Sequence, residues 1–156
     1  MAAKELQAII SGLQDVLHGH PWYGEPVFGL LQAVKPEKAF VRRSPEAHSC
    51  ADILWHMITW SEFVLDRIQE KSTYDENLLE SLNWRKLDPE NYSWEKGIAE
   101  FTRLQNAIVT ALSEKDDSFL DKQVDYRKYN FRVMLNGLSQ HHIYHVGQIA
   151  WISKFI

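Results

Sequence analysis

Three histidines lie close together near the C-terminus, in the stretch His141-His142-Ile143-Tyr144-His145. Imidazole is a common metal ligand, so their spacing decides whether they can reach one ion. In an α-helix each residue advances by about 100°, which places positions i and i+4 about 40° apart on one face. His141 and His145 therefore point in nearly the same direction, whereas His142 lies about 100° from His141.

The face shared by His141 and His145 is apolar. It also carries Met134, Leu138 and Ile152, while charged and amide side chains occupy the opposite side (Arg132, Asn136, Gln140 and Lys154). We therefore predict that His141 and His145 lie at the centre of a buried stripe, with His142 at its edge. Buried imidazoles are costly unless their nitrogens find partners. Two explanations stay open: two hydrogen-bonded core histidines, or one cation that satisfies both rings.

A third histidine, His56, is the candidate that would complete a metal site. It lies in the most apolar stretch of an earlier helix, Asp52–Trp60, and shares its face with Ile53 and Phe63. Three inward histidines on two helices form a His₃ arrangement, which suits zinc or a similar divalent ion with a position left for water. The sequence contains no Glu-x-x-His, so a di-iron carboxylate site is excluded.

Other histidines and the single cysteine have more ordinary explanations. His18 and His20 flank a helix end, and His48 precedes a helix start, where a role in chain entry is favoured over ligation. Cys50 lies about 120° from His56 by helical phase. We predict that Cys50 is neither a ligand nor a nucleophile, although a helix N-terminus can lower the pKa of a thiol.

Three residues near the candidate ligands carry two explanations each. Asp52, one turn before His56, could orient its imidazole, but a capping box with Ser49 is favoured. Gln148, one turn after His145, could face the site or form a hydrogen bond between helices. Tyr144 lies about 60° from the His141 direction and could line a pocket, with a core position favoured.

The elements that must position these residues are helical. Apolar residues recur at three- and four-residue steps over 6–17, and a short helix is expected over about 27–34. Longer helices are predicted from 50 to about 71, from 94 to about 114, and over about 130–155. Polar connections occupy 72–92 and 114–128. Four long amphipathic helices without strand-like alternation predict an all-α four-helix bundle, with residues 1–156 as one domain.

Composition narrows the function classes. The net charge of −4 argues against a nucleic-acid partner, which would require a basic face. One cysteine allows no intrachain disulfide and favours a cytoplasmic setting. We expect no signal peptide at the start, no membrane-spanning segment and no membrane partner.

Three segments together resemble the DinB-like superfamily of bacterial four-helix bundles. They are Pro21-Trp22-Tyr23-Gly24, HSCADILWHMITW at 48–60 and GLSQHHIYHVGQIAWI at 137–152. The resemblance implies an up-down-down-up bundle with long crossovers, often dimeric. It also implies a metal site built from one histidine of the second helix and two of the last, which fall on His56, His141 and His145. Family members often have a basic residue before Gly-Gln, where this chain has Val146.

The expected function follows from the His₃ site and the resemblance. We expect one divalent ion per chain, with zinc first and nickel or iron as alternatives. Some relatives are transferases or isomerases that use low-molecular-weight thiols, and others are described as metal-dependent hydrolases. The chain is therefore expected to be an enzyme that activates a thiol or water toward a small-molecule substrate. The alternative is a non-enzymatic bundle with a structural or ligand-binding metal. The resemblance and the aromatic content of 12% also lead us to expect a homodimer.

Overall fold

The computed structural model describes residues 4–156, and within them every regular element is a helix. The longer elements are α1 (Lys4–His18), α2 (Val27–Gln32), α3 (Cys50–Ile68), α4 (Glu76–Asn83), α5 (Trp94–Ser113) and α6 (Phe131–Ile152). Short 3₁₀ turns lie at Pro36–Lys38, Asp117–Asp121 and Ser153–Phe155. No helix in the described range is long and apolar enough to cross a membrane.

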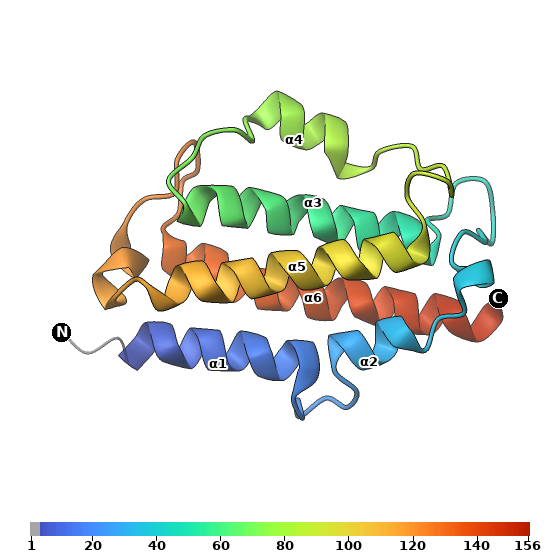
Figure 1. Cartoon of the computed structure of the whole chain (residues 1–156), viewed down its shortest axis with the longest axis horizontal. Coiled ribbons are helices and arrows are strands. Elements are labelled where there is room, and N and C mark those ends of the chain that lie inside the picture. The colour runs from blue at the N-terminus through green and yellow to red at the C-terminus, as the bar shows by residue number, and fades with distance from the viewer. Residues whose placement is uncertain (1–3) are drawn as a thin grey trace.

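Helices α1 and α2 follow each other along one side of the molecule and together take the place of one long helix, which we call a rod of the bundle (Figure 1). The other three rods are α3, α5 and α6. The first and last rods run in one direction and α3 and α5 run in the other, with long connections between them (Figure 1). This arrangement confirms the predicted all-α bundle with up-down-down-up topology. The expected homodimer stays a prediction.

Helix α3 is the central rod, and nearly all of its residues are buried. It packs against α5, α6 and α4. Its start is fixed by the predicted capping box: Ser49 Oγ accepts from the Asp52 amide at 3.1 Å, and the Asp52 carboxylate accepts from the Ser49 amide at 2.7 Å. Gly97 of α5 lets the two helices approach closely, since a Cβ there would lie 2.8 Å from Leu54 Cδ2.

Helix α4 occupies the segment for which the sequence predicted only polar turns. Asp75 caps it by accepting from the Leu78 amide at 2.9 Å. The connection that leads into α4 is anchored by a buried ion pair between Asp66 and Arg67, 2.6 Å apart. Arg67 also donates to the Tyr74 carbonyl at 2.5 Å. An eight-residue helix is marginal by itself, so these anchors and the packing of the buried Leu79 hold it on α3.

The buried stripe of α6 is centred differently from the prediction. His142, expected at the edge, has no exposed surface, whereas His141 is half-buried. Tyr144, for which a core position was favoured, is 65% exposed. The reason is that α6 packs against α3, α1 and α2, while His142 contacts Phe101 and Gln105 of α5. The buried face of α6 is therefore broad, and His141 lies at the margin that borders α3.

Candidate metal centre

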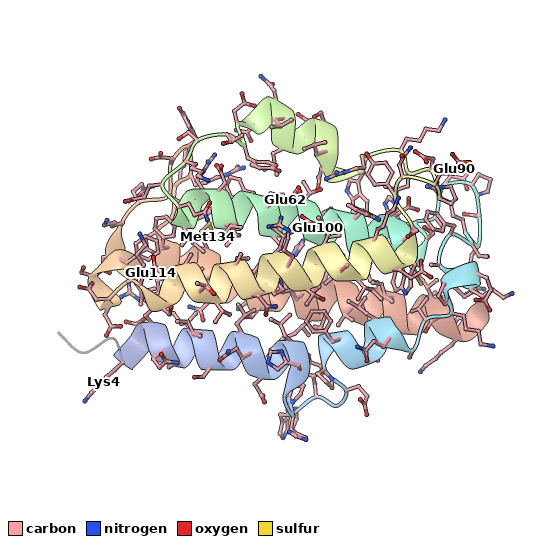
Figure 2. The ribbon with its side chains drawn as sticks, in the orientation of Figure 1. Lys4, Glu62, Glu90, Glu100, Glu114 and Met134 are labelled. Atoms are coloured by element: carbon pink, nitrogen blue, oxygen red, sulfur yellow. The ribbon has the colours of Figure 1, made fainter. Side chains whose placement is uncertain are left out.

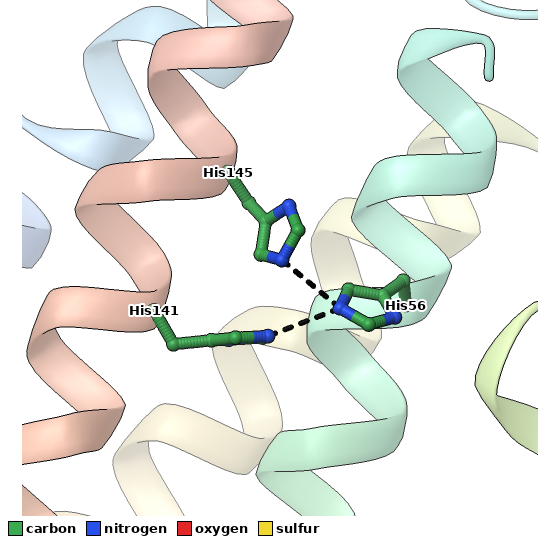
Figure 3. Close-up of side chains that lie close together, drawn as sticks. All are labelled: His56, His141 and His145. Atoms are coloured by element: carbon green, nitrogen blue, oxygen red, sulfur yellow. Dashed lines mark hydrogen bonds between the residues drawn. The ribbon is translucent and has the colours of Figure 1, made fainter. Parts of the chain in front are cut away.

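The three predicted histidines meet between α3 and α6. His56 Nε2 lies 3.1 Å from His141 Nε2 and 3.0 Å from His145 Nε2 (Figure 3). His141 and His145 project from consecutive turns of α6, and His56 faces them from α3 (Figure 3). Within residues 4–156, these three are the group of histidine, cysteine and carboxylate side chains close enough to share an ion. The structure therefore brings together the two rings that the helical phase of the HxxxH pair selected, although not at their predicted place in the buried stripe. That they bind a metal stays a prediction.

The protonation of two of these rings is set by their second nitrogens. His56 Nδ1 lies 3.3 Å from the Asn83 carbonyl oxygen, which can only accept, so Nδ1 carries the hydrogen. His145 Nδ1 lies 2.7 Å from Gln148 Oε1, which is also an acceptor. In their neutral forms both rings therefore present a bare lone pair at Nε2. This is the arrangement in which outer partners orient histidine ligands toward a metal.

The separations test whether a metal fits. Two bare lone pairs 3.0 Å apart, on His56 and His145, repel each other unless a cation lies between them. One N–H from His141 could bond to His56, but it would leave the His56–His145 contact uncompensated. Nitrogens each about 2.0–2.1 Å from a zinc ion lie about 3.3 Å apart in a tetrahedral site and about 2.9 Å apart in an octahedral one. The two separations from His56, 3.1 and 3.0 Å, fall between these values, and all three ligand atoms lie within 4.8 Å of one another. The donors are therefore close enough to share one divalent ion.

Burial keeps the imidazoles neutral, which a metal ligand requires. Desolvation is the main cause that lowers the pKa of His56 to about 4 and that of His141 to about 2. The pKa of His145 is also lowered by burial, against the hydrogen bond to Gln148, which raises it. All three rings are therefore free to donate lone pairs at neutral pH.

An aromatic stack supports His56 from the outside. The Trp84 ring lies between two imidazoles, with centroids 4.0 Å from His56 and 3.8 Å from His48, and it is nearly parallel to both. Asn83 fixes the same corner by accepting from Trp60 Nε1 at 3.0 Å. Sequence reasoning missed Asn83 and Trp84 because both lie in the segment read as polar turns. The tryptophan in that polar segment was a signal for Trp84. The Asn83 carbonyl belongs to the backbone, so the sequence holds no signal for it.

A pocket of about 450 Å³ opens beside the three Nε2 atoms. It extends along α3 and α6 toward Tyr129, away from the Trp84 stack. Its walls include Trp60, Phe63 and Leu138. A small molecule in this pocket would therefore lie next to any ion that the histidines hold.

The remaining candidates lie outside the centre. Asp52 is occupied by the capping box and by Arg42 at 2.9 Å, so the capping explanation holds and the Asn83 carbonyl takes the orienting role. Cys50 is fully buried, and burial raises the pKa of its thiol to about 11. His142 pairs with Gln105 across a 3.3 Å contact rather than with the centre.

The comparison with known families decides the membership of this chain. Residues 26–149 match the family model of the DinB superfamily. The chain belongs to the DinB superfamily. The match spans the segments that carry His56, His141 and His145. No curated protein in the comparison matches this chain.

A solved structure has the same fold as this chain. The colibactin self-resistance protein ClbS, solved in complex with a double-stranded DNA, aligns with a TM-score of 0.67 at 16% identity. The alignment covers 99% of this chain and 97% of ClbS. It corrects our expectation of no nucleic-acid partner. Net charge was the ground for that expectation, and a protein of the same architecture is seen on DNA, so the exclusion is wrong.

Proposed function

We propose that this protein is a metal-dependent enzyme in which His56, His141 and His145 hold one divalent ion. The observation that carries the proposal is that His56 Nε2 lies 3.1 Å from His141 Nε2 and 3.0 Å from His145 Nε2, with acceptors on the far side of His56 and His145. Three neutral imidazoles leave the ion its full positive charge. Such an ion polarises a carbonyl, lowers the pKa of bound water or holds a thiolate.

The coordination position left by the protein supports an enzyme over a structural site. A structural zinc site is closed by four protein ligands. Within the described residues no fourth histidine, cysteine or carboxylate joins the three histidines. The pocket beside them offers room for a substrate. The ion would activate either a thiol or a water to react with that substrate. Thiol transfer and hydrolysis are the two reaction types we propose, with zinc as the first choice of ion and nickel or iron as alternatives.

The test is cobalt substitution, because Co²⁺ reports its ligands through its visible absorption. An open His₃ site predicts that added azide or 2-mercaptoethanol changes the spectrum of the cobalt protein in a saturable way. The alternative, a closed structural site, predicts a spectrum that neither additive changes. Failure to bind cobalt at neutral pH would remove the proposal altogether. The His141→Ala variant is the control, since it should show no site-bound cobalt spectrum.

A second candidate function is binding to double-stranded DNA, supported by the likeness to ClbS over nearly the whole chain. Phosphate contacts would make such binding weaken steeply with salt. Fluorescence anisotropy with a labelled duplex at low and high salt tests it. Saturable binding that falls with salt supports this function, and no binding at low salt excludes it.

A further inference from the structure

The pocket beside the three histidines is lined mainly by apolar side chains. None of its lining residues is an aspartate, glutamate, lysine or arginine. Its walls are aromatic and aliphatic, from Trp60 and Phe63 on α3 to Leu138 and Met134 on α6. Figure 2 labels Met134 among the side chains. A volume of about 450 Å³ lies within the range of small-molecule sites.

Asn83 borders this pocket, and its side-chain oxygen and its backbone oxygen each already face a nitrogen. Asn83 Oδ1 accepts from Trp60 Nε1 at 3.0 Å, and the Asn83 carbonyl oxygen faces His56 Nδ1 at 3.3 Å. Two cations lie beyond the Phe63 ring: the guanidinium carbons of Arg67 and Arg127 are 4.7 and 5.1 Å from its centroid. Neither arginine lines the pocket. A charged ligand group placed there would lose its water without gaining an ion pair.

We propose that the substrate carries an uncharged apolar group, alkyl or aryl, next to its reacting atom, and that this pocket receives it. The proposal rests on the proposed function, because it places the reacting atom at the ion held by the three histidines. Apolar burial then provides the binding, while the ion selects the head group.

Gly137 determines how much apolar group the pocket accepts. It lies one turn before His141 and lines the pocket, and an added Cβ at this position would meet no atom within 4 Å. A larger side chain therefore has room and would fill space that the substrate would use. Gly147 is the matched control on the same helix: its Cβ would also meet nothing within 4 Å, and it does not line this pocket. Gly137 is thus a specificity-determining position.

The experiment measures binding of thiols to the cobalt-loaded protein, without oxygen, by absorption. Ethanethiol, butanethiol and hexanethiol share one head group and differ in apolar length. Each methylene transferred from water should tighten binding about fourfold until the pocket is full. The sulfonate 2-mercaptoethanesulfonate, which has the same head and a charged tail, should bind no better than ethanethiol. Gly137→Phe should abolish the gain with length, Gly137→Ala should reduce it, and Gly147→Phe should leave it unchanged.

A second readout needs no metal. The methyl signal of Met134, which lines the pocket, should shift when 1-hexanol is added to the apo-protein, while that of Met57, which is buried elsewhere on α3, should not. If the protein binds no cobalt, the proposed function fails, and a Met134 shift still supports an apolar site. If cobalt binds and ethanethiol perturbs it, but affinity does not rise with chain length, the apolar-substrate proposal is overturned and the metal site stands.

Discussion

The Nε2 atom of His56 lies 3.0 Å from that of His145, although 89 positions separate the two residues in the chain. The contact depends on two helices that are fixed independently. The Ser49–Asp52 capping box fixes the start of α3, and Asn130 caps α6 by accepting from the Val133 amide. Packing of α6 on α3 then brings the two rings together.

Removing the outer partner of His145 should weaken metal binding without changing a ligand. Gln148→Ala loses the acceptor 2.7 Å from His145 Nδ1, so the ring is no longer held in one orientation and tautomer. We expect metal affinity to fall about 10- to 100-fold, the usual cost of losing such a partner. Gln148→Glu keeps an acceptor and should retain affinity. A competition titration with a zinc-sensitive dye measures it, with Gln140→Ala, an exposed position on the same helix, as the control. Equal affinity in the Ala variant and the native protein would contradict an orienting role.

How much of this site could be predicted depended on how local its signals are. The HxxxH spacing selected His141 and His145 because helical phase is a local property, and the capping box at Ser49 was readable for the same reason. The burial of His142 was not readable, because it depends on contacts with Phe101 and Gln105 of α5, which lie far away in the sequence. The Asn83 carbonyl that orients His56 was also hidden, since the end of α4 is held by hydrogen bonds from Thr59 and Trp60, which lie far away in the sequence.

His142 should make the apo-protein less stable in acid. Burial lowers the pKa of His142 to about 3 in the folded protein, against about 6.5 when unfolded. Between these values the unfolded chain binds a proton that the folded protein does not. This part of the stability is therefore complete above about pH 6.5 and is lost as the pH falls. Urea unfolding of chelator-treated protein between pH 6 and 4 should show a steep loss. In His142→Leu the loss should be smaller by about 1.4 kcal/mol per pH unit. An unchanged slope would show that His142 is already charged in the folded state.

Cys50 should matter neither for metal nor for reactivity. Its thiol is buried beside the Ile149 carbonyl, and the pKa of about 11 keeps it protonated at neutral pH. Cys50→Ala should retain the full metal content. In the native protein, labelling by iodoacetamide should be slow until urea is added. Rapid labelling of the folded protein, or loss of metal in the variant, would assign Cys50 a role that its burial argues against.

The metal content of five proteins purified side by side tests the central claim most directly. The native chain and His142→Ala, after incubation with zinc at neutral pH and dialysis, should each hold about one ion per chain by elemental analysis. His56→Ala, His141→Ala and His145→Ala should each hold less than about a tenth of that, because two imidazoles bind the ion poorly. Circular dichroism should show all five folded, since apolar packing rather than the ion supports the bundle. A native protein without metal, or a His142→Ala variant that loses the ion while His141→Ala keeps it, would contradict the proposed centre.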